Sequence, residues 1–451
     1  MRKRISAFFS VLAAIVLLTV PASAASSGST LKIICADAGQ VIFTPPGSTQ
    51  YAYRYGPAIL IDGDRIDIWA SAPPLVSNGV RYGNDSIEYI RSTDGGKTWT
   101  EWKTVLYPTL NSEDQWSTCD PGAFKYGDYY YVGYTGSPEF RTNPDKDPEV
   151  NNLFIARAKN PEGPYEKWNG NGWGGDPYAI TRYSGDGVGC SMPSFTVKGD
   201  TLYMYYVDQT HPDQDWNSEG NISVSTFSLK DPNWPGNELS NKMCENKPEE
   251  VRYCPDIDKF IGFQLKGGWD YDSYVEIYES TDGVNFTKTS SFRNNFPHYA
   301  HNIGISGNNL GQLDLSIQNY IGTAYTPTGV EAWWGHWHTQ LIPLYIREEQ
   351  PSSTTPSQPS GSTDSSSQKP TTSSVGSTDG ESSETEVSEP QNSNIESTVS
   401  DDKDKDKEVN NKTEQQEETS YLWLYIVIGA VVVLAGAGTA VYFLVIKKKH
   451  V

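Results

Sequence analysis

The stretch YGPAILIDGDRIDIWAS, residues Tyr55–Ser71, contains two short apolar runs separated by a turn. An Asp-Gly pair at Asp62 and Gly63 marks the turn, and Pro57 stands near the start of the first run. Alternating runs rich in Ile and aromatic residues, bounded by Gly and Asp, are typical of β-strands. The stretch therefore predicts an antiparallel pair of strands.

The same pattern returns four more times along the chain. The later copies begin CDPGAF at Cys119, SMPSF at Ser191, YCPDI at Tyr253 and, without the proline, HNIGI at His301. Their second runs are YYYVGYT, TLYMYYV, FIGFQL and LDLSIQ, and third and fourth runs follow, the last being TQLIPLYI. Five units of four antiparallel strands predict an all-β fold, a five-bladed β-propeller over residues 30–347. The segment TLKIICA (Thr30–Ala36) is expected to supply an outer strand that closes the ring. A sandwich or barrel is the alternative, but neither predicts a repeated proline at the head of each unit.

A second repeated pattern joins the third strand of a blade to the fourth. It reads IRSTDGGKTWTEW at Ile90–Trp102 and YESTDGVNFTKT at Tyr278–Thr289. The Asp can accept hydrogen bonds from the amides of the turn, Gly supplies a positive φ, and Trp99 or Phe286 packs back between strands. This hairpin resembles the Asp-box of sialidases and other propellers. The resemblance implies a structural role on the outer part of the blade, away from the active site.

The opposite end of the propeller is therefore expected to carry the ligand. The segments that enter the first strands meet there, together with the long loops between second and third strands. Long polar and aromatic loops that converge on a propeller axis are a common place for a binding site. Examples of these loops are residues 71–85, 136–151, 208–221 and 266–273.

Three segments of blades two and three resemble glycoside hydrolase family 43 and its relatives. They are DPGAFKYGDYYYVGYT (Asp120–Thr135), FIARAKNPEGPYEKW (Phe154–Trp168) and MPSFTVKGDTLYMYYVD (Met192–Asp208). The resemblance implies a five-bladed propeller that hydrolyses polysaccharides with three acids at the first-strand entries. Glycosidic cleavage needs one carboxyl group ionised and another protonated, on opposite sides of the bond.

Asp120 matches one of these acidic positions, whereas blades one and three depart from the pattern. Gly56 stands at the position before the proline in blade one, and Met192 stands at that position in blade three. Nearby acids are the candidate catalytic partners of Asp120, namely Asp186, Asp208 and Glu139.

Several other residues are candidates for contacting the substrate. Arg54 and Arg252 occupy similar places before a proline, as RYGP and RYCP, and guanidinium groups suit a sugar carboxylate, as in sialidases. For each arginine the structural alternative is a surface ion pair. Two tryptophans, Trp116 and Trp269, could stack on sugar faces. The last two candidates are Asp256, which follows Pro255, and His301 at the fifth entry. For each of these four residues a purely structural role is the alternative.

The two ends of the chain predict an anchored surface protein. Residues 1–24 have a basic start, an apolar run and a small-residue exit, which is typical of a signal peptide. Residues 349–420 are rich in Ser, Thr, Pro and acidic residues and predict a disordered stalk. Residues 421–446 are uncharged and long enough to span a bilayer, and the Lys-rich tail at 447–451 is expected in the cytoplasm.

The composition favours an extracellular partner other than nucleic acid. The formal net charge is -21, much of it in the stalk, and no basic patch suggests nucleic acid. The number of cysteines is five, which is odd; Cys119 and Cys190 could pair, but buried free thiols are the preferred interpretation. No spacing of ligands requires a metal or cofactor, although an axial Ca²⁺ is compatible with the fold.

These observations lead to one main hypothesis and two alternatives. The main hypothesis is a glycoside hydrolase on a bacterial cell surface, anchored by one membrane span and acting on an extracellular glycan. The first alternative is a non-catalytic carbohydrate-binding propeller or adhesin. The second is a sialidase-like hydrolase of an anionic sugar.

Overall fold

Antiparallel β-sheets make up the part of the chain that the computed structural model describes, which comprises residues 29–47, 52–138, 150–182, 188–210, 220–327 and 336–349. These residues contain no α-helix, so none of them forms a helix able to cross a membrane. All of them belong to one compact unit, Met1–Gln358. The predicted signal peptide, membrane helix and cytoplasmic tail lie outside the described residues, as does the predicted stalk after Glu349.

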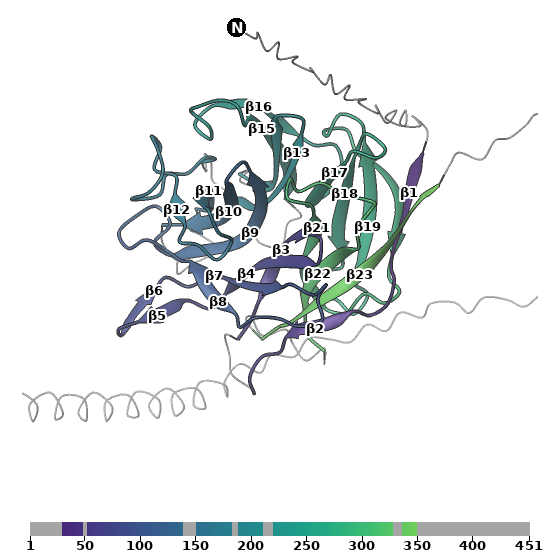
Figure 1. The fold of residues 1–451 in the computed structure, drawn as a ribbon, viewed down its shortest axis with the longest axis horizontal. Coiled ribbons are helices and arrows are strands. Elements are labelled where there is room, and N and C mark those ends of the chain that lie inside the picture. Colours follow the sequence, from purple (N-terminus) through teal and green to yellow (C-terminus); the bar gives the residue numbers. More distant parts are fainter. Residues whose placement is uncertain are drawn as a thin grey trace, which may run out of the picture. The chain divides into compact units, whose positions relative to one another are not determined.

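The sheets are arranged around a centre as five blades of four strands each (Figure 1). Blade one consists of β3 (Tyr55–Asp62), β4 (Arg65–Ala72), β7 (Ser86–Ser92) and β8 (Lys103–Leu106). Blade two consists of β9 (Ser117–Tyr126), β10 (Tyr129–Ser137), β11 (Asn152–Ala158) and β12 (Glu166–Lys167). Blade three consists of β13 (Gly189–Lys198), β14 (Thr201–Gln209), β15 (Asn221–Ser228) and β16 (Glu238–Met243). Blade four consists of β17 (Glu250–Cys254), β18 (Lys259–Lys266), β19 (Tyr274–Ser280) and β20 (Thr287–Phe292).

Blade five contains both ends of the described chain. It consists of β21 (Ala300–Gly307), β22 (Asn319–Tyr325), β23 (His338–Glu349) and, from the N-terminus, β1 (Thr30–Cys35). β1 pairs antiparallel with β23, so that Thr30 lies opposite Glu349. The predicted closure of the ring by the segment at Thr30 is therefore confirmed. Two short additions complete the fold: β2 (Gln40–Phe43), which also pairs with β23, and a hairpin of β5 (Leu75–Ser77) and β6 (Val80–Tyr82).

Two strand predictions in blades four and five are wrong. LDLSIQ, residues 313–318, lies between β21 and β22, because the Asp314 carboxylate accepts a bond from Ser316 N and Asn319 Nδ2 donates to the Asp314 carbonyl, which closes a turn. In blade four, YCPDI does not start the first strand, since Pro255 lies in the turn between β17 and β18. The chain instead enters blade four through Glu249, directly before β17.

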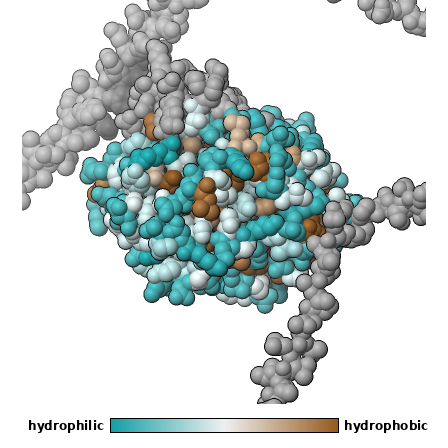
Figure 2. All heavy atoms as spheres, turned by 90° about the horizontal axis from the view of Figure 1, so that it is seen from above, coloured by the Kyte–Doolittle hydropathy of each residue, from teal (hydrophilic) through white to brown (hydrophobic). Residues whose placement is uncertain are grey.

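Aliphatic and aromatic residues fill the spaces between neighbouring blades. Each pair of adjacent blades shares at least one buried cluster. In order around the ring, the clusters include Trp69 with Val132, Phe124 with Phe195, Tyr205 with Phe260, Phe263 with Ile305, and Leu341 with Ile59. Because burial of apolar area drives folding, these five interfaces hold the ring together. The surface seen in Figure 2 is mostly hydrophilic, with hydrophobic residues in small separate spots.

The hairpin between β7 and β8 lies at the same end of the propeller as the turn between β3 and β4, because Gly95 N donates to Asp64 O at 2.8 Å. We call this the hairpin end, and the opposite end, where the chain enters the first strands, the entry end. The hairpin bonds as its sequence predicts: Gly96 N donates to Ser92 Oγ at 2.8 Å, and Thr98 N donates to Asp94 Oδ1 at 2.9 Å. The hairpin between β19 and β20 is built in the same way around Asp282.

Candidate functional site

A cavity of about 730 Å³ lies at the entry end and is lined by residues of all five blades. Its lining combines carboxyl groups, amides and aromatic rings: Tyr55, Asn84, Asp85, Trp116, Ser117, Cys119, Asp120, Thr135, Asn151, Ser191, Met192, Val207, Gln209, Gly220, Ile222, Lys247, Glu249, Gln264, Leu265, Trp269, His301 and Asn302. The sequence-based prediction that the site faces away from the Asp-Gly hairpins is consistent with this position.

A repeated irregularity of the backbone occurs where four of the first strands pass the cavity. Gly56, Asp120, Met192 and Asn302 all have φ between 48° and 57°, and the pairing of each first strand with the second shifts register there. Such a bulge re-aims a side chain, and a positive φ is uncommon for residues other than glycine. Of the four residues, the three that have a side chain are in contact with one another through Asn302. Asn302 Nδ2 lies 3.3 Å from Asp120 Oδ1 and 3.9 Å from Met192 Sδ.

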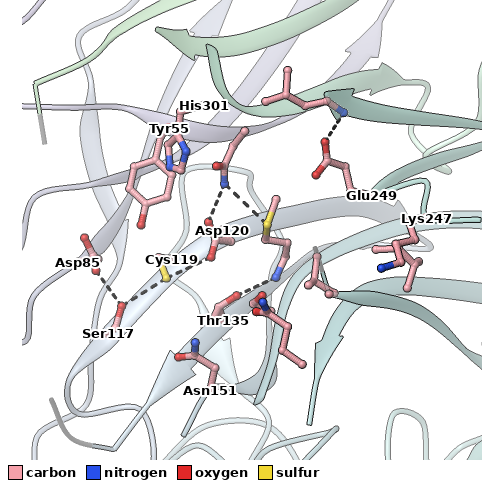
Figure 3. Close-up of a pocket in the computed structure, with 18 of the residues that line it drawn as sticks. Tyr55, Asp85, Ser117, Cys119, Asp120, Thr135, Asn151, Lys247, Glu249 and His301 are labelled. Atoms are coloured by element: carbon pink, nitrogen blue, oxygen red, sulfur yellow. Dashed lines mark hydrogen bonds between the residues drawn. The ribbon is translucent and has the colours of Figure 1, made fainter. Parts of the chain in front are cut away.

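Asp120 is the acid at the centre of this group (Figure 3). Its backbone amide donates to Ser71 Oγ at 2.7 Å, which fixes the bulge. Burial raises the pKa of its carboxyl group to about 6, the nearby Asp85 carboxylate adds to the rise, and hydrogen bonds from Cys119 and Thr135 oppose it. Asp120 can therefore hold a proton in mildly acidic solution, where ordinary aspartates are ionised.

Asp85 is a second acid of the cavity, on the Ser117 side of Asp120 in Figure 3. Three groups donate to its carboxylate: Tyr53 Oη at 2.5 Å, Ser117 Oγ at 2.9 Å and Asn84 Nδ2 at 3.2 Å. Burial raises its pKa, and these hydrogen bonds oppose the rise. The Cys119 thiol lies between the two acids, 3.4 Å from Ser117 Oγ and 3.5 Å from Asp120 Oδ2. The acids are thus linked through a chain of polar side chains.

Glu249 is the third acid of the cavity and comes from the entry to blade four. Figure 3 shows it on the other side of Asp120 from Asp85. Its Oε1 accepts a hydrogen bond from Leu265 N at 2.6 Å, which ties the entry of blade four to the end of β18. Lys247, two residues earlier, also lines the cavity. The cavity therefore presents carboxyl groups from blades one, two and four.

Aromatic rings form one wall of the cavity. Trp269 packs on His301 with ring centroids 4.2 Å apart, and His301 contacts Tyr55 at 5.5 Å and the buried Trp337 at 4.4 Å. Burial lowers the pKa of His301 to about 3, so the imidazole is neutral at ordinary pH. Trp116 lines the cavity from the entry to blade two. The predicted candidates Trp116, Trp269 and His301 are therefore brought to the same cavity as Asp120.

Both predicted arginines lie outside the cavity lining and serve the fold. Arg54 forms an ion pair with Glu88 at 2.5 Å and lies over the ring of Phe43 at 4.6 Å. Arg252 is buried, pairs with Glu250 at 2.7 Å and donates from Nε to the Ile305 carbonyl at 3.0 Å. The prediction for Arg252 assumes that Pro255 is an entry proline, whereas Pro255 lies in the turn after the strand. Arg252 therefore sits within β17, between blades.

Two predicted acids also lie outside the cavity lining. Asp208 accepts bonds from Thr210 and Ser223, and it alternates along β14 with Val207 and Gln209, which do line the cavity. Asp256 lies in the turn between β17 and β18 at the hairpin end, where it accepts a bond from Leu315 N at 3.2 Å. The candidates Asp186 and Glu139 fall outside the described residues.

The described residues contain no group of three or more His, Cys, Asp or Glu side chains that could hold a metal ion. All five cysteines are free and buried, which confirms the interpretation as free thiols over a Cys119–Cys190 disulfide.

Sequence reasoning missed Asp85, Glu249 and Asn302 as site residues. Glu249 occupies the position that prolines hold in the first three blades, because Pro57, Pro121 and Pro193 each stand five residues before the last residue of the first strand. In blade four the same count back from Cys254 reaches Glu249. Asn302 carries no proline signal, and Asp85 reaches the cavity from the start of a third strand.

No protein-family model matches the sequence, and no curated protein matches it. Solved structures of glycoside hydrolases do match. Zg3597, a family 117 glycoside hydrolase produced by the marine bacterium Zobellia galactanivorans, is 14% identical, with a TM-score of 0.46 over 72% of this chain and 92% of that chain. The α-L-arabinofuranosidase PaAbf62A from Podospora anserina, in complex with cellotriose, is 12% identical, with a TM-score of 0.44 over 71% and 98%.

A GH43_1 enzyme from Xanthomonas citri is 13% identical, with a TM-score of 0.43 over 68% of this chain and 90% of that chain. The expected likeness to glycoside hydrolase family 43 is thus found among solved structures. The propeller fold follows from the strand pairing described above.

Proposed function

We propose that the cavity binds a sugar residue of a glycan and that the protein is a glycoside hydrolase. The observation that carries this proposal is the set of three carboxyl groups, Asp85, Asp120 and Glu249, around one cavity with aromatic and amide side chains. Aromatic rings suit the apolar faces of sugars, amides suit their hydroxyl groups, and paired carboxyl groups supply acid and base catalysis.

The three acids divide into different roles in this proposal. Asp120 is the proton donor, because its raised pKa of about 6 keeps the carboxyl group protonated in mildly acidic solution. Glu249, on the other side of Asp120 from Asp85, is the carboxyl group that activates water or attacks the sugar. Asp85 holds its position through Tyr53 and Ser117 and acts on Asp120 through its charge. Acid and base catalysis by these groups uses no cofactor.

A binding protein without catalysis is the alternative that Gly56 and Met192 favour. These two residues occupy the bulge positions equivalent to Asp120, and neither carries a carboxyl group. A sialidase-like hydrolase loses its support, because Arg54 and Arg252 are absent from the cavity lining. The predicted signal peptide, stalk and membrane span add the proposal that the glycan is extracellular and that the protein acts at a cell surface.

The test is a screen of the full-length protein against aryl glycosides and polysaccharides, with release of reducing ends as the readout. We expect Asp120→Asn to lower kcat/KM by about 10²- to 10⁴-fold, the usual contribution of a general acid. The matched control is Asp256→Asn, which changes an aspartate at the hairpin end and should retain activity.

Three outcomes separate the hypotheses. Hydrolysis that disappears in Asp120→Asn alone supports the proposal. Undiminished hydrolysis by Asp120→Asn would contradict the role given to this residue. Binding of a glycan without turnover, measured by calorimetry, would favour the non-catalytic alternative.

A further inference from the structure

Beside the cavity lies a group of three exposed or half-buried rings, Trp269, Tyr271 and His298, which we call the aromatic platform. Trp269 lines the cavity and is 38% exposed, and Tyr271, two residues further along the same loop, is 58% exposed. The ring of Tyr271 stacks on His298 with centroids 3.8 Å apart and planes 19° from parallel. The platform therefore runs along one loop from a ring that lines the cavity to a more exposed ring outside the cavity lining.

The platform is braced from below by two loops that bond each other. Trp269 N donates to Ala300 O at 2.9 Å, and Tyr299 N donates to Asp270 O at 2.9 Å. Arg293 Nη2 donates to the Tyr271 carbonyl at 3.1 Å and also contacts the His298 ring. These bonds fix the loop that carries Tyr271 against the segment that leads into β21.

Two residues of this brace adopt a costly backbone conformation. Trp269 has φ of 71° and Tyr299 has φ of 53°, in the left-handed region that bulky residues rarely occupy. Such strain persists where the surroundings over-determine it, and it clusters at binding sites. The ring of Tyr271 contributes little to the stability of the fold, because more than half of its surface is exposed to water.

We infer that the aromatic platform is a second sugar-binding subsite, which holds the neighbouring residue of a glycan chain whose first residue occupies the cavity. This inference rests on the proposed function and narrows its substrate class to oligosaccharides and polysaccharides. The flat face of a pyranose presents C–H groups that pack on an exposed ring, and the ring loses little conformational entropy because it is already held in place. Trp269, which lines the cavity, and Tyr271 lie two residues apart on one loop, so the two subsites are neighbours along that loop.

The experiment compares short and long glycans on the full-length protein. A plant and bacterial glycan array presents each sugar as a monosaccharide and as a chain of six residues, and affinities of the hits are measured by calorimetry. We expect the wild type to bind the six-residue form more tightly. Tyr271→Ala should lower the affinity for the six-residue form about threefold to tenfold, as expected for the loss of one ring contact, and leave the affinity for the monosaccharide unchanged.

Matched variants isolate the ring of Tyr271. Tyr271→Phe keeps the ring and should bind like the wild type, while Tyr271→Leu keeps an apolar side chain without a flat face and should bind like Tyr271→Ala. Tyr345→Ala removes a tyrosine of similar exposure from β23 and should have no effect. Thermal unfolding of each variant confirms that its fold is intact.

The outcomes distinguish this inference from the function on which it rests. Equal affinity of the wild type for both lengths, or an unchanged length preference in both Tyr271→Ala and Tyr271→Leu, would overturn the platform and leave the proposed function standing. Absence of binding to every glycan by the wild type would overturn the proposed function and the platform together.

Discussion

Asp94 and Asp120 lie at opposite ends of the propeller, and the pKa values of their carboxyl groups are shifted in opposite directions. In the hairpin, the side chain and backbone amide of Thr98 and the hydroxyl of Ser92 donate to Asp94 and lower its pKa to about 2. At the entry end, burial raises the pKa of Asp120 to about 6. A carboxylate that closes a turn is stabilised as the anion, whereas one at a cavity wall is ready to hold a proton.

The largest expected effect on stability tests the entry end. Asp120 has a folded-state pKa above its unfolded value, so the folded state binds more protons and loses stability as pH rises from about 4 to about 6. Asp120→Asn mimics the protonated form and should raise the free energy of unfolding at pH 7 by up to about 3 kcal/mol. Denaturant titrations of the full chain at pH 7 and pH 4 measure this gain, which should vanish at pH 4. An equal gain at both values of pH would contradict the raised pKa.

A smaller effect of opposite sign is expected at the hairpin end. Asp282 Oδ1 accepts bonds from Val284 N and Asn285 N, so Asp282→Ala leaves these amides to water and loosens the turn. We expect a loss of about 1 kcal/mol, in line with the loss of a side-chain cap, with glycan binding and turnover unchanged. Chemical denaturation gives the loss, and Asn285→Ala, which keeps the Asp282 carboxylate, is the partner variant. A changed kcat/KM would show that the two ends are coupled.

The smallest expected effect concerns the interaction between the two acids of the entry end. Asp85 raises the pKa of Asp120 through its charge, so Asp85→Asn should move the basic limb of the pH–activity profile to lower pH. The reason is that Asp120 would release its proton more readily without a nearby carboxylate. The profile of kcat/KM against pH measures the shift. Ser117→Ala tests whether the effect of Asp85 on the pKa of Asp120 depends on the Ser117 hydroxyl, which donates to Asp85, or on the charge of Asp85 alone.

The sequence predicted the blades more completely than the site because the two depend on different information. Strand runs and turn residues repeat in each blade, so a local pattern identified blades one to three and the closing strand β1. The site depends on which residue of each entry takes the left-handed bulge and on which acids reach the axis. Asp120 is recognisable because it precedes a proline, whereas Asn302 occupies the same bulge without one.

The errors in blade four have one physical source. Its first strand is short and its turn is wide, since Cys254 pairs with Lys259 across four residues, and a proline happens to stand within that turn. Because Pro255 resembles an entry proline, the sequence-based prediction assigned Arg252 and Asp256 to the entry end and did not recognise Glu249. Asp85 could not be inferred from strand patterns, because its role depends on contacts with Tyr53 and Ser117 from other segments of the chain.

The pairing of β1 with β23 has a consequence for the order in which the protein can fold. Thr30 and Glu349 are neighbours in the sheet although they stand at the two extremes of the domain sequence. The last blade therefore stays incomplete during synthesis, and its edge stays unpaired, until the final strand has been made. A chain cut before His338 would lack β23, and β1, β2 and β22 would then lose the strand with which each of them pairs.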